Sequence, residues 1–178
     1  MVIRGFALFE TAIGPCGLAW SARGIAGLNL PEGNEHRTRA RLIERFPGAS
    51  EETPPPEIQR AIDSIVQLLA GEPRDLSGLA LDETGVPEFN ARVYAIARTI
   101  PPGTTVSYGE IARQLGDLTL SRAVGQALGQ NPFPIVVPCH RVLAADGSLG
   151  GFSAKGGVET KRRLLTLERA LRQGSLEF

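Results

Sequence analysis

The first half of the chain begins with a strand-like hydrophobic pattern. Residues 5–12 and 17–30 mix alternating apolar positions with glycines, which is typical of short antiparallel strands. Between them, Gly14-Pro15-Cys16-Gly17 predicts a turn. A further short strand is expected at residues 76–81.

Helical spacing of apolar residues predicts the remaining elements. In the first half, one helix should run from Asn34, as its N-cap, to about Phe46, and a second from Ile58 to Leu69. In the second half we expect helices at 89–100, 109–115, 121–130 and 158–172. A glycine-rich loop is expected at 144–157.

The two helices at 109–115 and 121–130 flank a tight turn at Gly116-Asp117-Leu118-Thr119, which is a helix-turn-helix arrangement. Arg122 starts the second helix, where such a helix meets a nucleic-acid duplex. Ala123 and Gly125 are small enough to permit a close approach to a backbone or groove. The alternative interpretation is that these small residues only allow the two helices to pack tightly.

The pattern as a whole predicts an α+β protein with two parts. A small strand-containing N-terminal α+β support domain (1–85) would precede a mainly helical C-terminal domain (86–178), with the boundary at Asp82-Glu83-Thr84-Gly85. Charge changes at the same place. Residues 1–87 hold 8 Arg and 12 Asp plus Glu, giving −4, whereas residues 88–178 hold 11 Lys plus Arg and 7 Asp plus Glu, giving +4. The second part therefore suits an anionic partner.

Composition excludes several classes of protein. No apolar run approaches the ~20 residues that span a bilayer, and the N-terminus lacks a signal-peptide pattern, so we expect a cytoplasmic protein. Two distant cysteines, Cys16 and Cys139, argue against a disulfide framework or a four-ligand zinc site. Cys16 has no close cationic neighbour and is interpreted as structural, and His36 as a surface residue. The glycine-rich loop at 144–157 fits no nucleotide-binding motif, so no cofactor is expected. With only His36 and His140 as histidines, a metal centre would need carboxylates as well, and no metal is expected.

The segment Ile135-Val136-Val137-Pro138-Cys139-His140-Arg141-Val142 carries the candidate chemistry. Its β-branched run predicts a buried strand or core segment that Pro138 ends. Cys139 is either a small core residue or a nucleophile. On an extended backbone Cys139 and His140 would point to opposite faces and could not easily share a hydrogen bond, unless the chain turns sharply between them. We therefore expect a relay in which His140 removes the thiol proton through a bridging water.

Glu168 is the candidate partner of His140. It falls in an apolar stripe with Leu164 and Leu171, at helical spacing, where a carboxylate needs a partner. That partner is either Arg172, in an ordinary ion pair, or a histidine across the core.

Three groups of residues together resemble the O6-alkylguanine-DNA alkyltransferases, also called methylated-DNA–protein-cysteine methyltransferases. They are Pro101–Tyr108, then Ser121–Gly125 with Asn131–Val142, and finally Gly156-Gly157 with Lys161, Leu164-Leu165 and Glu168. The match is specific over about residues 88–170, and only architectural before them.

The resemblance implies a direct, single-turnover DNA repair in which Cys139 irreversibly takes the alkyl group of O6-alkylguanine, and of O4-alkylthymine, from a nucleotide flipped out of the duplex. His140 and Glu168 match the activating relay, Asn131 a residue that braces the cysteine turn, and Tyr108 a proton donor to the departing guanine. Arg122 matches the arginine that fills the space of the extruded nucleotide.

The family's remaining positions concern DNA and the base. Ser107, Ala123 and Gly125, with Tyr108 and Arg122, would contact double-stranded DNA through the minor groove, largely independently of sequence, in a monomer. The base pocket would be lined by Cys139, Val142, Phe152 and Ser153.

Two features depart from the family's pattern, and two other functions remain open. Phe152 stands where many relatives have tyrosine, and Ser153–Gly157 is longer than in some relatives, which leaves alkyl-size preference open. A non-catalytic binder of alkylated guanine is one alternative, although such relatives lack the cysteine. A cysteine hydrolase is the other, disfavoured by the adjacency of Cys139 and His140.

Overall fold

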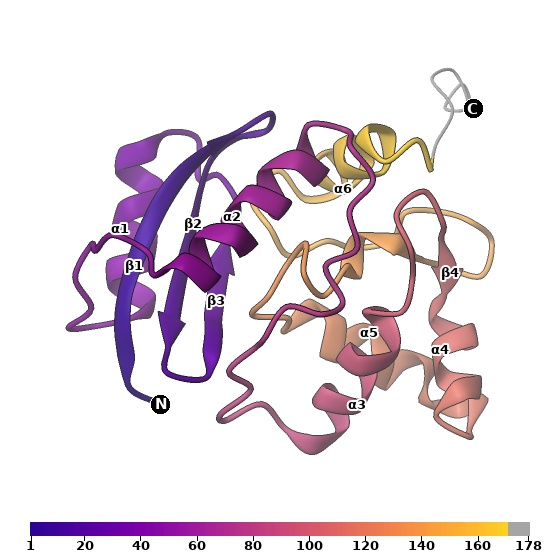
Figure 1. Ribbon diagram of the computed structural model, residues 1–178. Coiled ribbons are helices and arrows are strands. Elements are labelled where there is room, and N and C mark those ends of the chain that lie inside the picture. Colours follow the sequence, from indigo (N-terminus) through magenta and orange to yellow (C-terminus); the bar gives the residue numbers. More distant parts are fainter. Residues whose placement is uncertain (171–178) are drawn as a thin grey trace.

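The computed structural model describes residues 1–170 (Figure 1). Its N-terminal part is an antiparallel sheet of β1 (Ile3–Thr11), β2 (Gly14–Ser21) and β3 (Gly24–Asn29), in that order. The strands predicted in residues 5–30 are therefore present, the longer stretch being divided in two between Ser21 and Gly24.

The turn predicted at Gly14–Gly17 lies a few residues earlier in the structure, between Thr11 and Gly14. The Thr11 hydroxyl donates to the Gly14 carbonyl (2.7 Å) and accepts from the Ile13 amide (3.2 Å), which closes the turn before β2 begins. Cys16 instead lies within β2, paired with Phe9, and is fully buried.

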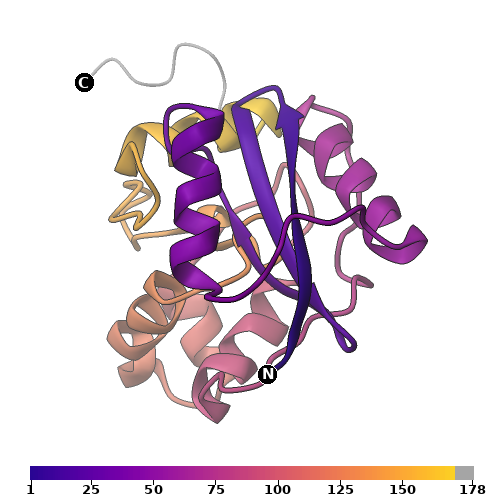
Figure 2. The same ribbon diagram turned by 90° about the vertical axis from the view of Figure 1, so that its left-hand side faces the viewer.

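Both faces of the sheet are covered, as the two-residue period of a strand requires. α1 (Glu35–Arg45) and α2 (Pro56–Leu69) lie on opposite sides of it (Figure 2). Phe6 and Ala19 pack with Leu42 and Phe46 beneath α1, while Leu18 belongs to the larger core that also includes α2 and the C-terminal half. Asn34 caps α1 as predicted, accepting from the Arg37 amide (2.9 Å).

The strand predicted at residues 76–81 does not form. The Arg98 guanidinium donates to the carbonyls of Ser77 (2.7 Å) and Leu79 (2.6 Å), so the backbone of this segment is bonded to a side chain instead of a ladder. Only Leu81 makes an isolated bridge, to Ile25 of β3.

The C-terminal half is mainly helical, and its short parallel pair of strands joins segments far apart in the sequence. Its elements in order are α3 (Glu88–Ala97), β4 (Val106–Ser107), α4 (Tyr108–Gln114), the 3₁₀ turn η1 (Leu118–Leu120), α5 (Ser121–Gly129), the 3₁₀ turn η2 (Cys139–Arg141), β5 (Val142–Leu143) and α6 (Gly157–Leu167). The helices predicted on either side of the Gly116–Thr119 turn are thus α4 and α5, which pack together.

The last helix is shorter than predicted. α6 ends at Leu167, Glu168 is its C-cap, and Arg169 has a left-handed φ of 60°, which stops helical hydrogen bonding. Leu171 and Arg172 lie outside the described residues.

The predicted α+β class is confirmed. One hydrophobic cluster runs from Leu18 and Leu28 of the sheet through Ile62 of α2 to Val93 and Cys139 of the C-terminal half. The sheet thereby buries one face against the segment that carries the cysteine. No helix within residues 1–170 is long and apolar enough to cross a membrane.

Candidate active site

The segment before Cys139 is a buried turn, so the strand interpretation is wrong and the core interpretation is correct. Ile135 has a φ of 74°, which no strand accommodates, and the Val137 amide donates to the Phe133 carbonyl (2.8 Å). Ile135 and Val137 are nevertheless almost completely buried. Asn131 braces both arms of the turn, donating from Nδ2 to the Val137 carbonyl (2.8 Å) and accepting at Oδ1 from the Phe133 amide (2.9 Å).

Cys139, His140 and Arg141 form the 3₁₀ turn η2, so the backbone turns sharply here and is not extended. After Pro138, the Arg141 amide donates to the Pro138 carbonyl (2.9 Å), and the Val142 amide donates to the Cys139 carbonyl. A single helical turn allows two consecutive side chains to reach the same partner, which an extended strand does not.

That shared partner is Glu168, whose side chain is 4% exposed. His140 Nε2 lies 2.8 Å from Glu168 Oε1, so the predicted pairing of Glu168 with a histidine forms. Arg141 contacts both carboxylate oxygens, through Nε to Oε2 (2.9 Å) and Nη2 to Oε1 (2.7 Å), and Nη1 donates to the Ile100 carbonyl. The alternative partner, Arg172, is outside the described residues.

Electrostatics fix the protonation of this cluster. Burial alone would raise the pKa of Glu168, but hydrogen bonds from His140 and Arg141 outweigh it and lower the pKa to about 2. Burial lowers the pKa of His140, against the opposing influence of Glu168, so the imidazole is neutral at pH 7. An ionised carboxylate can only accept, so the neutral ring must carry its proton on Nε2.

The other ring nitrogen, Nδ1, is left as an acceptor. It is buried, and among residues 1–170 it has no hydrogen-bond partner. A neutral imidazole oriented by an ionised carboxylate and holding a free lone pair is the arrangement of a general base.

Cys139 is a free thiol that is 9% exposed. Burial raises its pKa, while the neighbouring Asn131 side chain and the Lys161 charge act in the opposite direction. Lys161 is itself fully buried, donates to the Val142 carbonyl (2.6 Å), and lies 5.9 Å from the centre of the Tyr108 ring. Burial lowers its pKa to about 8, so Lys161 remains mostly charged at neutral pH.

A cavity of about 480 Å³ opens at Cys139. It is lined by Tyr108, Gly125, Leu128, Gly129, Gly151, Phe152 and Ser153 as well. Three of the four predicted base-pocket residues therefore share one cavity. Val142 is buried behind it, with its carbonyl directed to Lys161.

The residues predicted to contact DNA lie on α4 and α5 beside this cavity. Arg122 is exposed at the start of α5, and Ala123 and Gly125 are half-buried on the same helix. The Ser107 hydroxyl accepts from the Glu110 amide (3.1 Å) and so caps α4, which leaves its proton available to another acceptor.

The sequence analysis assigned no role to two residues of the cluster, Arg141 and Lys161. Arg141 follows His140 directly, and a guanidinium in a buried segment needs a carboxylate as much as an imidazole does. Lys161 precedes Leu164, Leu165 and Glu168 by three, four and seven residues, which places its charge on the apolar face of α6. The other two candidates behave as expected, since Cys16 is buried in the sheet and His36 is exposed.

We expect Glu168→Gln to lower the free energy of unfolding by about 3 kcal/mol at pH 7, because it leaves a buried guanidinium without its carboxylate. The folded pKa of about 2 is below the ordinary 4.5, so this contribution is present above pH 4.5 and is lost as the pH falls towards 2. Urea denaturation from pH 7 to pH 3 should show the two proteins converging. Glu159→Gln, an exposed carboxylate of α6, is the control, and a pH-independent gap would contradict the assignment.

Lys161→Met should separate stability from reactivity. Removing a buried charge that has no carboxylate partner should leave the melting temperature unchanged or raise it. The same change removes the cation beside Cys139, which should raise the pKa of the thiol by about one unit, equivalent to 1.36 kcal/mol. The thiolate fraction, and with it the rate of thiol alkylation at pH 7, should then fall by about tenfold. Above pH 8, where Lys161 loses its own proton, the rates should converge. Arg162→Met, on the same helix, is the control and should leave the alkylation rate unchanged at both pH 7 and pH 9. If Lys161→Met slowed alkylation equally at pH 7 and pH 9, an electrostatic role of Lys161 would be excluded.

Comparisons with known proteins agree with this geometry. Residues 88–170 match the family described as 6-O-methylguanine DNA methyltransferase, DNA binding domain. The methylated-DNA–protein-cysteine methyltransferase of Methanothermobacter thermautotrophicus is 35% identical over 158 residues, 89% of this chain and 81% of that protein. Its counterpart from Mycobacterium bovis is 43% identical over 149 residues, 82% of this chain and 88% of that protein.

A solved structure shows similarity of the same extent. The Mycobacterium tuberculosis OGT in complex with DNA is 36% identical, with a TM-score of 0.75 over 93% of each chain. The similarity covers the sheet as well as the cysteine segment. The chain belongs to the family of methylated-DNA–protein-cysteine methyltransferases.

Proposed function

We propose that this protein repairs DNA directly by transferring the alkyl group of O6-alkylguanine, and of O4-alkylthymine, to Cys139. The main support is the position of the Cys139 thiol, which lines a base-sized cavity and directly precedes an imidazole held by a buried carboxylate. This arrangement supplies a nucleophile, a base and a space for the substrate in one place.

The reaction requires a thiolate and a protonated leaving group. His140 Nδ1 takes the thiol proton through a bridging water, and Glu168 stabilises the resulting imidazolium. The sulfur forms a bond to the alkyl carbon, the bond from that carbon to guanine O6 breaks, and its electron pair leaves with the guanine. Tyr108, in the same cavity, gives a proton to the departing ring.

The product explains why the reaction occurs once per protein molecule. A thioether has no good leaving group at neutral pH, so water does not regenerate the thiol. The protein needs no cofactor or metal for this transfer, because the thiol is both nucleophile and final acceptor.

DNA is bound through α4 and α5. In this proposal α5 enters the minor groove of double-stranded DNA, with Ala123 and Gly125 close to the backbone and Ser107 and Tyr108 at the start of α4. Exposed Arg122 enters the base stack in place of the extruded nucleotide, which offsets the few kcal/mol lost on unstacking. Binding by a monomer to the phosphate backbone should be largely independent of sequence and weaken with salt.

A second function, recognition of alkylated bases without chemistry, is suggested by one comparison. The DNA base-flipping protein of Thermus thermophilus is 45% identical over 112 residues, 63% of this chain and 74% of that protein. The presence of Cys139 in the cavity favours transfer over recognition alone.

Incubation with a duplex containing one O6-methylguanine should add a single methyl group (+CH2) to Cys139, measured by peptide mass spectrometry. The yield should stop at one methyl group per protein molecule. Cys139→Ala should still bind the duplex, which separates recognition from transfer. Binding without any adduct on the unaltered protein would instead support the base-flipping function.

Arg122→Ala should slow repair of the duplex by about 10- to 100-fold, because the unstacking cost of a few kcal/mol is no longer offset. Reaction with free O6-methylguanine base should change less than twofold. Arg60→Ala, an exposed arginine of α2, controls for the lost charge. Equal losses with duplex and free base would contradict the flipping role.

A further inference from the structure

Cys139 also lines a second cavity, of about 400 Å³, on the side facing the N-terminal part. We call it the α1-side cavity. Leu28, Asn29, Leu30 and Glu32 line it from β3 and the segment after it, and Arg41 and Arg45 from α1. The opposite wall includes Pro132, Pro134, Ala154 and Lys155. Leu128, Gly129, Phe152 and Ser153 line both cavities, so the two meet around Cys139.

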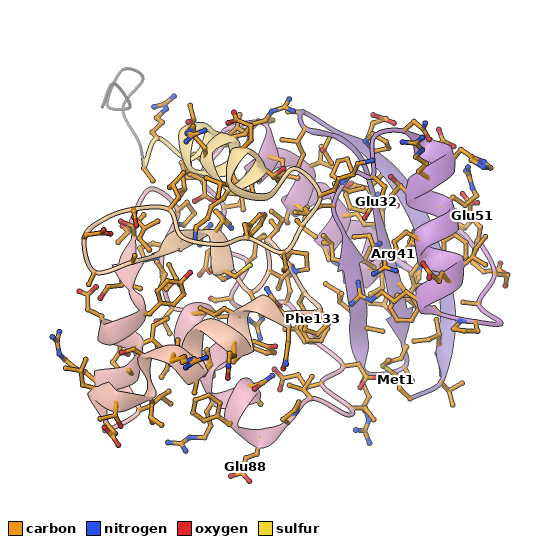
Figure 3. All side chains as sticks on the ribbon, turned by 180° about the vertical axis from the view of Figure 1, so that it is seen from behind. Met1, Glu32, Arg41, Glu51, Glu88 and Phe133 are labelled. Carbon is orange, nitrogen blue, oxygen red and sulfur yellow. The ribbon has the colours of Figure 1, made fainter. Side chains whose placement is uncertain are left out.

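The α1-side cavity is predominantly cationic. Arg41, Arg45 and Lys155 line it against one carboxylate, Glu32. Figure 3 shows Glu32 and Arg41 on the face of the molecule that also carries the segment at Phe133. A net positive wall with the reacting cysteine at one end favours an anionic group inside.

Arg45 is the fixed cation of this wall. Its guanidinium donates to the carbonyls of Leu28 (3.0 Å) and Pro132 (2.8 Å) and to Asn29 Oδ1 (2.7 Å), all of them neutral acceptors. Within residues 1–170 no carboxylate forms an ion pair with it, and two of its five N–H groups remain unused. Burial, with a smaller influence from Arg41, lowers its pKa, as expected of a partly desolvated charge without an anion.

The other two cations can turn towards a ligand at little cost. Arg41 pairs with Glu44 (2.8 Å), and both side chains are more than half exposed, so the pair contributes little. Lys155 donates to the backbone carbonyl of Glu32, and its side chain lies in the exposed loop before α6.

The geometry of displacement relates this cavity to the substrate. Sulfur, transferred carbon and departing O6 lie in a row, so the remainder of an alkyl group extends sideways from that row. With guanine in the Tyr108 cavity, the α1-side cavity is a second space that meets Cys139.

We propose that the α1-side cavity receives the distal part of larger O6-alkyl groups and favours those that end in a carboxylate. This rests on the proposed alkyl transfer. The chemistry is unchanged, since the sulfur–carbon bond forms and the carbon–O6 bond breaks as before. The carboxylate takes no part in the step and stays bound to Arg41, Arg45 and Lys155 while the thioether forms.

The test uses duplexes of one sequence carrying O6-(3-carboxypropyl)guanine, its neutral near-isostere O6-(3-carbamoylpropyl)guanine, or O6-methylguanine. The second-order rate of adduct formation on Cys139 is measured by mass spectrometry. The unaltered protein should transfer the carboxylate form about tenfold faster than the amide, an effect expected of charge-assisted hydrogen bonds that are partly exposed. The ratio of the carboxylate rate to the amide rate is compared between proteins. Any difference between two proteins in DNA binding cancels in this ratio, because the two duplexes differ only in the end of the alkyl group.

Replacing two cations should remove this preference. In Arg41→Gln/Lys155→Gln the ratio should fall to between one and three, with the rate for O6-methylguanine within twofold of the unaltered protein. Arg60→Gln/Arg92→Gln removes two exposed charges elsewhere and should keep the ratio near ten. Raising the salt concentration should lower the ratio of the unaltered protein towards the ratio of Arg41→Gln/Lys155→Gln.

The outcomes separate this proposal from the one on which it rests. Methyl transfer with a ratio near one, or a ratio that Arg41→Gln/Lys155→Gln leaves unchanged, overturns the cationic cavity and leaves the alkyl transfer standing. Absence of methyl transfer to Cys139 overturns the proposed function, and the role of the cavity with it.

Discussion

One buried carboxylate, Glu168, joins the parts of the structure on which the candidate site depends. It accepts from His140 and Arg141 of η2, and Arg141 in turn donates to the carbonyl of Ile100, just after α3. The end of α6, the cysteine turn and the end of α3 therefore meet at one ionised group. Because the carboxylate is satisfied by a guanidinium as well as by the imidazole, it can stay charged while the histidine stays neutral. Because the histidine is neutral, its Nδ1 remains in the interior as an acceptor without a hydrogen-bond partner among the described residues.

The N-terminal sheet contributes more than cover to this arrangement. The Pro132 carbonyl accepts from the Leu28 amide of β3 (3.0 Å) and from Arg45 of α1 (2.8 Å). Pro132 is next to Asn131, whose amide braces the turn before the cysteine. The position of the cysteine turn is therefore fixed from both halves of the chain. A division at residue 85 describes the order of elements along the sequence, whereas the packed core and the hydrogen bonds run across it.

Local sequence signals predicted the elements well and the cysteine turn poorly. Caps and helical spacing identified the helices to within a few residues, because these depend on neighbours along the chain. Ile135-Val136-Val137 has the composition of a strand, yet Ile135 adopts a left-handed φ, a conformation that Asn131 and the packing of the segment hold in place. Glu168 could be recognised as needing a partner, but the choice of both His140 and Arg141 depends on the 3₁₀ turn, which is a tertiary result. The α1-side cavity was beyond sequence analysis, since its walls come from segments about a hundred residues apart.

The two cysteines are alike in burial and differ in what surrounds the sulfur. Both are buried, and burial raises the pKa of each, to about 12 for Cys16. Cys16 lies in a strand, with the Thr11 hydroxyl 3.8 Å from its sulfur and Glu10 as an unfavourable charge. Cys139 lines a cavity, with Lys161 as a buried cation near its sulfur and the neutral imidazole of His140 as the next residue along the chain. Burial is therefore common to both, and the two thiols differ in the charges placed around the sulfur and in access to a cavity. Because burial outweighs the charge of Lys161 and raises the pKa of Cys139, the resting sulfur is a thiol, a much weaker nucleophile than a thiolate, and the proposed transfer needs a base to remove its proton.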